Sequence, residues 1–380
     1  MDFTFTEEQQ AAVEAAKAVF SGVAPDSVPS PALTPGAVAE EHDRPLWARL
    51  AAADLLGLVI TPAHGGAGLD PIALCLVLRE AAKALARVPL LEHSTVAMTV
   101  ERHGSATLKD TVLGPAGRGE LVLTAAANGR TGHDPAELAV TARQDDQDGH
   151  DWVLDGVQTG VPWAHSADLI AVPAHTADGR TVLALVPRAA PGLTLADQFS
   201  TSGELLAEAR LDSVRLQGHD VIDTVGAWEW LRELLATGTC ALALGLGEAV
   251  LGLTSRYTGT REQFGHPIAT FQAVAVQAAD RYIDLRAMEV TLWQAAWRIS
   301  TDAPGALPTA GDIAVAKIWA SEGVRRVVQT AQHLHGGFGA DTDYVLHRYH
   351  AWAKQLELSL GPAAAHEEAL GDLLAAHPLG

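Results

Sequence analysis

The stretch Gln332-His-Leu-His-Gly336-Gly337-Phe-Gly339 stands late in a helix-rich chain. Each glycine lowers helix propensity by roughly 1 kcal/mol relative to alanine, so this run is costly inside or beside a helix. Glycines at such places let a phosphate or another backbone approach closely. A second motif, Arg261-Glu-Gln-Phe264-Gly265 with Phe271-Gln272 after it, precedes the run. The glycine run therefore predicts a phosphate-proximal loop.

The composition favours a helical protein with large buried areas. The chain has 380 residues, which predicts two or three domains. It is 48% hydrophobic and only 5% aromatic, a balance that suits helix bundles and an oligomer. The formal net charge of −20 argues against a nucleic-acid partner. A phosphate-bearing ligand remains compatible, because local arginines and helix N-termini bind phosphate.

The two cysteines and the apolar segments indicate the cellular compartment of the protein. Cys75 and Cys240 each lie in an apolar stretch and are expected to be small buried side chains, neither disulfide-bonded nor nucleophilic. The N-terminus lacks a basic region followed by an apolar core, so no signal peptide is expected. We find no uninterrupted apolar run of roughly 18 residues, so no membrane span is expected. A cytoplasmic protein is the resulting expectation.

The periodicity of the apolar residues predicts an α+β multidomain fold. Residues 1–117 read as an all-α domain that opens with a capping box of Thr6 and Gln9. Residues 118–220 contain short Val- and Leu-rich runs between turns, which is typical of a β-sandwich or barrel. Residues 221–380 return to apolar spacings of three and four, and read as a helical bundle. The helices expected in this last region lie near 225–260, 266–300, 309–335 and 343–374.

The order of helices, strands and helices, together with the two motifs, resembles the acyl-CoA dehydrogenase family over nearly the whole chain. Gly65-Gly66-Ala-Gly68 looks like the glycine loop of that family's first domain. The segments 257–272 and 332–339 look like its two carboxy-terminal signatures. The resemblance implies an N-terminal helical domain, a central β domain and a C-terminal four-helix bundle. It also implies FAD bound across a subunit interface.

The resemblance assigns the carboxy-terminal motifs to the ADP half of the FAD of a neighbouring subunit. Arg261 would pair with the pyrophosphate, since a guanidinium fork suits phosphate geometry. Phe264 would pack near the adenine or ribose, and Gln272 would hydrogen-bond the nucleotide. Without the second motif, a surface ion pair would be the simpler role for Arg261. The residues assigned to FAD in this way are Arg261, Phe264, Gln272, Gln332, Gly336 and Gly337.

The β domain departs from the family pattern where a subunit contacts its own flavin. The family has a Thr-Glu-Pro-Gly-Ala-Gly-Ser-Asp type of loop, and the corresponding residues 124–132 lack its acid, proline and serine. The family's Trp-Ile-Thr segment is replaced by Val161-Pro-Trp163-Ala-His165. Trp163 is left with two interpretations, as a contact to the flavin edge or as a core tryptophan.

The catalytic base of the family is missing at both of its usual positions. Counting on from the glycine run places Leu360 where most members have a glutamate, and Leu235 falls where some relatives carry it instead. A leucine cannot abstract a proton from the substrate. Glu233 and Glu229 lie near Leu235 and Glu357 lies near Leu360, which makes Glu233 and Glu357 the candidate displaced bases. Each also fits an ordinary helix-surface residue.

Three hypotheses follow from the resemblance. In the first, the chain is one subunit of a heteromeric acyl-CoA dehydrogenase whose partner subunit supplies the flavin contacts and the base. The family then implies FAD, an acyl-CoA or other acyl thioester as substrate, often with a bulky acyl group such as a sterol side chain, and an electron-transfer acceptor. In the second, the chain is a self-sufficient homo-oligomer that uses a displaced carboxylate on a biosynthetic acyl thioester. In the third, it is a non-catalytic scaffold subunit.

A metal site is not expected. His333 and His335 flank the glycine run, and His347 and His350 are three residues apart, a spacing that can share a helix face. No cysteine or cluster of acids completes a ligand set in the sequence near them. The nucleotide assignment already accounts for this region, so no metal ligand is predicted.

Overall fold

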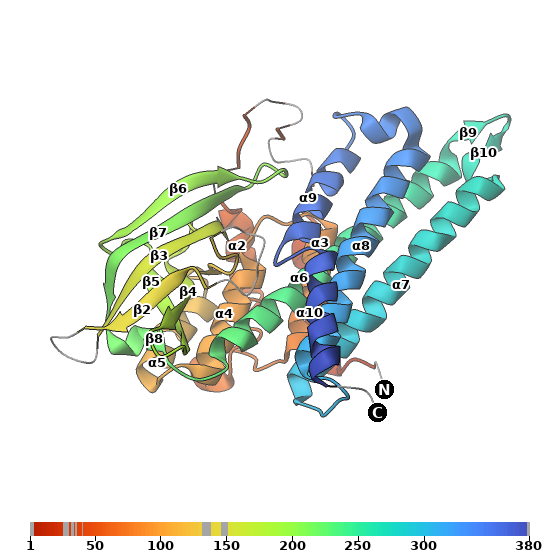
Figure 1. Cartoon of the computed structure of the whole chain (residues 1–380). Helices are drawn as coiled ribbons and strands as arrows, with labels where there is room; N and C mark the ends of the chain where they lie inside the picture. The colour runs from red at the N-terminus through yellow and green to blue at the C-terminus, as the bar shows by residue number, and fades with distance from the viewer. Residues whose placement is uncertain are drawn as a thin grey trace.

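The computed structural model describes residues 4–25, 30–31, 34, 36–39, 41–130, 138–145 and 151–377. A β-sheet lies on one side and a set of long helices on the other, with the shorter N-terminal helices between and beneath them (Figure 1). The chain runs from helices into strands and back into helices, which confirms the predicted fold class. The N-terminal helices are α1 (Glu7–Phe20), α2 (Arg44–Ala52), α3 (Pro71–Lys83), α4 (Leu90–His103) and α5 (Ala106–Gly117).

Local side-chain caps explain where the first helices begin. Thr6 accepts a hydrogen bond from the Gln9 amide at 3.2 Å, and the Gln9 side chain accepts one from the Thr6 amide at 3.0 Å. This is the predicted capping box. The same Gln9 donates to both carboxylate oxygens of Asp70, at 3.0 and 3.1 Å. Since Asp70 caps α3 through the Ala73 amide, one polar cluster starts two helices and docks α1 on α3.

The central strands form one hydrogen-bonded sheet. Its order is β6-β7-β3-β2-β4-β5-β8, and β1 pairs in parallel with β4. Apolar side chains of alternate residues fill one face and make a second core, separate from the helical one. The predicted β region is therefore present, and its strands are joined along a single path. The strands are β1 (Leu123–Ala125), β2 (Val140–Gln144), β3 (Trp152–Pro162), β4 (Leu169–Thr176), β5 (Thr181–Pro187), β6 (Leu193–Phe199), β7 (Leu205–Leu216) and β8 (Val221–Ile222).

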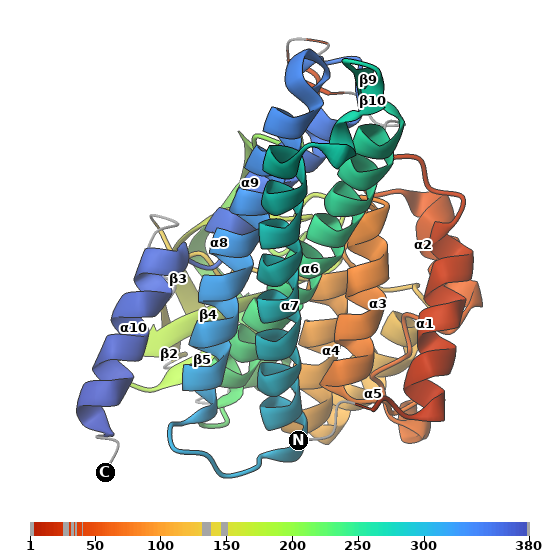
Figure 2. The same ribbon diagram turned by 90° about the vertical axis from the view of Figure 1, so that its right-hand side faces the viewer.

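The C-terminal helices pack around α6, which runs through the centre of the molecule (Figures 1 and 2). The final predicted helix, near 343–374, is two helices. The break falls at Leu360 and Gly361, which have φ values of +58° and +95°, and Pro362 then starts the next helix. The helices are α6 (Ala227–Thr260), α7 (Gln272–Thr301), α8 (Thr309–His335), α9 (Leu346–Leu358) and α10 (Ala363–Ala376).

The turn between α6 and α7 also differs from the sequence-based expectation. A helix was expected from about residue 266, but the chain first forms a hairpin of β9 (Glu262–Gln263) and β10 (His266–Pro267). Phe264 and Gly265 at its tip both have positive φ, at +54° and +78°. His266 and Pro267 pair with Gln263 and Glu262 across this two-residue turn, so they are extended and cannot open a helix. α7 begins only at Gln272.

Helix α6 is long and apolar enough to cross a membrane by length and composition. We expected no such segment, because polar residues interrupt its apolar runs. In the structure, 78% of its most apolar window is buried within the protein. α6 is therefore the core helix of the bundle here.

Helix α7 carries an exposed row of apolar side chains. Val276, Ile283 and Val290 are spaced seven residues apart and are 51%, 62% and 49% exposed. Tyr282 beside them is 59% exposed. A seven-residue spacing places side chains along one stripe of a helix. In Figure 2, α7 lies in front of the bundle, on the face turned towards the viewer.

The crossing of α3 and α6 gives a stability prediction. A Cβ atom at Gly245 would lie 2.0 Å from the backbone oxygen of Arg79, so Gly245→Ala must push two helices apart. We expect it to lower the free energy of unfolding by about 1–3 kcal/mol. Gly259→Ala, on the same helix with nothing within 4 Å, is the control and should raise it by about 1 kcal/mol or less. Urea denaturation followed by circular dichroism measures both, and equal effects would contradict the close crossing.

Candidate functional site

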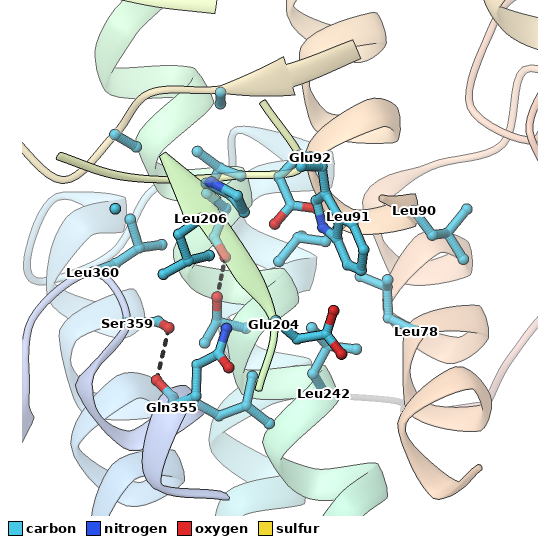
Figure 3. Close-up of a pocket in the computed structure, with 18 of the residues that line it drawn as sticks. Leu78, Leu90, Leu91, Glu92, Glu204, Leu206, Leu242, Gln355, Ser359 and Leu360 are labelled. Atoms are coloured by element: carbon cyan, nitrogen blue, oxygen red, sulfur yellow. Dashed lines mark hydrogen bonds between the residues drawn. The ribbon is translucent and has the colours of Figure 1, made fainter. Parts of the chain in front are cut away.

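A cavity of about 190 Å³ lies where the helical and β regions meet. Its walls come from α3, α4, α6, α9, the end of β3 and the start of β7 (Figure 3). Most of the lining side chains are leucine, alanine or valine. An apolar cavity with few polar groups is the usual form of a small-molecule site. The polar side chains that reach it are Glu92, Asn128, Trp163, Glu204, Thr239, Gln355 and Ser359.

Both positions at which the sequence predicted a missing base lie on this cavity. Leu235 on α6 and Leu360 after α9 line it together, and both are buried, at 3% and 9% exposure. The fold thus brings together Leu235 and Leu360, which are far apart in the chain and which the family resemblance marked independently as the two base positions. Neither side chain can transfer a proton, so the wall is inert at both positions.

A buried lysine holds the turn that carries Leu360. The Lys317 ammonium on α8 is fully buried and donates to Ser321 Oγ at 2.8 Å and to the Gly361 carbonyl at 3.1 Å. It also reaches the Glu357 carbonyl at 3.3 Å, at the end of α9. Burial lowers the pKa of Lys317 to about 8, so it remains mostly charged at neutral pH. A cation is well placed against the free carbonyls of a helix C-terminus.

The two predicted displaced bases do not line the cavity. Glu357 turns its carboxylate to Lys354 at 2.6 Å. Glu233 is half-buried on α6 beside Arg232, and burial raises its pKa. Glu229 precedes it by one turn on the same helix. The structure therefore brings none of these carboxylates to Leu235 or Leu360.

Two carboxylates that sequence reasoning missed do line the cavity. Glu204 is paired with Arg87, whose Nε and terminal nitrogen donate at 2.5 and 2.8 Å. Glu92, near the start of α4, is half-buried, and burial raises its pKa to about 7 although a hydrogen bond to the Trp163 side chain opposes the shift. In the sequence Glu92 looks like any acid in the first turn of a helix. Its burial depends on the β domain that covers it.

The altered β-domain loop, residues 124–132, is hydrogen-bonded to the backbone at the end of β3. Thr124 donates to the Pro162 carbonyl at 2.6 Å, and the Asn128 amide donates to the Gly160 carbonyl at 3.0 Å. Trp163 adopts a left-handed backbone conformation, with φ of +58°, and lines the cavity. The last two residues of the altered loop, 131 and 132, lie outside the described residues. The Thr124 hydroxyl and the Asn128 amide thus donate to the protein's own backbone.

The residues assigned to the nucleotide lie at the far end of the bundle, around the β9–β10 turn (Figure 1). Arg261 is exposed and makes no ion pair with any described residue. Phe264 is 92% exposed at the tip of the turn, with its ring centroid 6.3 Å from that of Phe271. Gln272 is exposed at the first position of α7. An unpaired cation beside an exposed ring fits a nucleotide supplied from outside.

The glycine run meets this end through contacts of Tyr257 with two aromatic rings, those of His335 and Phe338. Tyr257, in the last turns of α6, stacks on His335 with ring centroids 4.3 Å apart and donates to the His335 carbonyl at 3.2 Å. Gly339 serves packing, because a Cβ there would lie 2.1 Å from the Gln332 oxygen. Gly336 and Gly337 are exposed, and a Cβ on either would meet nothing within 4 Å. Their backbone is open to a ligand or another subunit.

The cavity and the β9–β10 turn lie far apart along α6. Leu242, the cavity residue of α6 nearest to that turn, and Thr260, the last residue of the helix, are separated by about 27 Å along the axis, because an α-helix rises about 1.5 Å per residue. A distance of this size is close to the diameter of a small domain. The chain therefore carries two separate regions, one beside the first half of α6 and one at its C-terminal end.

Comparison with known proteins decides the family. The models for the N-terminal and C-terminal domains of acyl-CoA dehydrogenase match residues 6–120 and 233–374. Acyl-CoA dehydrogenase FadE27 of Mycobacterium tuberculosis is 35% identical over 344 residues, which cover 89% of this chain and 90% of that protein. The chain belongs to the acyl-CoA dehydrogenase family.

Two similar solved structures of the acyl-CoA dehydrogenase family carry the names of paired chains. A chain in the ChsE4-ChsE5 complex from Mycobacterium tuberculosis is 33% identical, has a TM-score of 0.90 and covers both chains completely. A chain of the Tcur3481-Tcur3483 steroid ACAD is 36% identical, has a TM-score of 0.88, and the match covers 97% of this chain and 98% of that one. Both matches show that the chain has the fold of this family over its whole length.

The pKa of Glu92 gives a pH-dependent prediction. Between pH 4.5 and 7 the folded state keeps the Glu92 proton while the unfolded state releases it. Stability from this group is thus present below pH 4.5 and lost as the pH rises through 7. Relative to Glu92→Gln, the free energy of unfolding of the wild type should fall by at most about 3 kcal/mol from pH 4.5 to 8.

Urea denaturation of both proteins across this pH range measures the difference, in which the other titrating groups cancel. A difference that stays flat would show that Glu92 titrates at its ordinary pKa.

Proposed function

We propose that this chain is one of two unlike subunits of an FAD-dependent acyl-CoA dehydrogenase, and that it holds the ADP half of an FAD whose flavin lies in the partner subunit. The observation that carries the proposal is the pair Leu235 and Leu360 on one cavity wall. Both family positions for the base are apolar there, which supports a base supplied by another chain.

The residues at the far end of α6 fit the ADP half of FAD. Arg261 offers a guanidinium without an intramolecular partner among the described residues, and such a fork pairs well with a pyrophosphate. Phe264 offers an exposed ring for the adenosine. The open backbone of Gly336 and Gly337 permits close approach, and Gln272 and Gln332 supply amides. When bound, FAD supplies the acceptor for the hydride removed from the acyl group.

The chain's own residues would then bind and orient rather than catalyse. Arg261 fixes the position of the phosphates, and the rigid α6–α7 pair carries it. Because α7 begins at Gln272, its N-terminal amides add a favourable field for the anion. These contacts act on the cofactor from about 27 Å away from this chain's cavity, measured along α6. They therefore serve a flavin in a neighbouring subunit.

The exposed apolar row on α7 supports an oligomer. Val276, Ile283 and Val290 would stay in water in an isolated subunit. Their seven-residue spacing suits packing against another helix. An interface there would also bring a second chain beside the nucleotide end, because α7 starts at that end.

The proposed substrate is a bulky acyl thioester, with a steroid-bearing acyl group as the first choice. The support is that the Tcur3481-Tcur3483 protein, 36% identical, is named a steroid ACAD. In the reaction a base removes the α-proton of the thioester, and a double bond forms as the β-hydride leaves. An electron-transfer acceptor would then reoxidise the cofactor.

The proposal is tested by co-expression with the neighbouring dehydrogenase gene. Arg261→Ala in this chain should lower the FAD content of the complex at least about tenfold, since a charge-assisted phosphate contact is lost. Visible absorbance near the flavin band, measured per mole of complex, gives the content. Arg210→Ala, an exposed arginine on β7 paired with Glu208, is the matched control and should leave it unchanged.

The two other hypotheses predict different particles. A self-sufficient homo-oligomer would purify alone as a yellow, active protein, and loss of activity in Glu233→Gln or Glu357→Gln would then identify its base. A non-catalytic scaffold would contain no flavin in any complex. Either result would refute the proposed division of labour between two subunits.

A further inference from the structure

The cavity beside Leu235 and Leu360 keeps the form of a ligand site although both family base positions are apolar. Its volume of about 190 Å³ exceeds that of an apolar cavity of about 150 Å³ that takes up benzene in another protein. Leu78 and Leu242 continue the apolar wall (Figure 3). Packing alone would favour a filled core here, because empty apolar space costs contacts.

One polar group in the cavity has capacity left for a ligand. The Glu92 carboxyl points towards the middle of the cavity in Figure 3. It receives a hydrogen bond from the Trp163 side chain, and two carboxyl oxygens offer about four acceptor sites in total. Two hydroxyl groups that also line the cavity are already engaged. Ser359 Oγ donates to the Gln355 carbonyl at 2.7 Å, and Thr239 donates to the Leu235 carbonyl at 2.8 Å.

The charged groups around Glu92 leave it as the single free charge of the cavity among the described residues. Glu204 is neutralised by Arg87 in a two-pronged ion pair. His93, the next residue on α4, accepts a hydrogen bond from the Leu123 amide at 3.3 Å, and burial lowers its pKa to about 4, so it is neutral. From α6 and α9 only uncharged side chains reach the cavity.

We propose that this cavity is a binding site of the chain's own, for a neutral apolar ligand whose hydroxyl group donates a hydrogen bond to Glu92. The leucine walls take the hydrocarbon part, and Trp163 fixes the carboxyl in position. Above pH 7, where Glu92 is ionised, an anionic ligand is disfavoured, because two like charges would meet in an apolar setting. This site is separate from the nucleotide end, so it does not rest on the proposed dehydrogenase function.

The test compares two probes of equal chain length, 1-octanol and octanoate, by isothermal titration calorimetry at pH 8. The protein is used in the assembly in which it purifies. Octanol should bind the wild type at least about tenfold more tightly than octanoate, because a buried like-charge pair is costly. Glu92→Gln should strengthen octanoate binding by about tenfold or more, since the amide donates to a carboxylate.

A merely structural role for Glu92 would not produce this change of preference. Glu233→Gln is the matched control, because Glu233 is also half-buried on a helix but does not line the cavity. It should leave both affinities unchanged. The proposal is overturned if octanol does not bind the wild type, or if Glu92→Gln leaves the ratio of the two affinities unaltered.

Discussion

The buried ammonium of Lys317 is the interaction on which the shape of the cavity depends. It ties α8 to the end of α9 and to the turn before α10 through three backbone carbonyls. Carbonyls at a helix end have no partner within the helix, and a buried one without a donor costs about 1–3 kcal/mol. The same turn holds Leu360 in a left-handed conformation that leucine rarely adopts. Ser321 Oγ and His366 Nε2 add contacts to the Glu357 and Leu360 carbonyls of the same turn, at 3.1 and 2.9 Å.

Helix α6 connects this wall to the nucleotide end. It contributes Leu235 to the cavity at one end and leads into Arg261 at the other. Gly245 in its middle lets the backbone of α3 come close, which keeps the helix in the core. One rigid element therefore sets the separation of two regions with different chemistry.

The parts of this structure that could be predicted are those determined by residues close together in the sequence. Thr6 and Gln9 predicted a helix start because a capping box involves residues three apart. The glycine and arginine motifs predicted the family, which the comparisons confirm, and their assignment to a nucleotide stays a prediction. The break at Leu360 was missed although Gly361-Pro362 is a turn signal, because the apolar spacing continues across it. Where the structure tests them, the expected buried cysteines are confirmed, with Cys75 and Cys240 both free and buried.

The cavity carboxylates could not be predicted for a physical reason. Glu233 and Glu357 were chosen for closeness in sequence, but Glu233 is two residues from Leu235, and successive helical residues turn by about 100°, which puts the two on opposite faces. Glu92 reaches the cavity only because α4 packs under the β domain, with Trp163 brought in from the end of β3. The periodicity of apolar residues predicts helices and strands, but it does not predict contacts between segments that are distant in the sequence.

The exposed row on α7 has a consequence for how the protein is made. An isolated subunit presents Val276, Ile283 and Val290 to water, with the ring of Phe264 at the end of the same helix pair. Such surfaces associate non-specifically when no matching chain covers them. A cell that produced this chain in excess would therefore lose the surplus to aggregation or proteolysis. If the proposed second subunit covers this row, balanced synthesis of the two chains, rather than high intrinsic stability, sets the amount of functional protein.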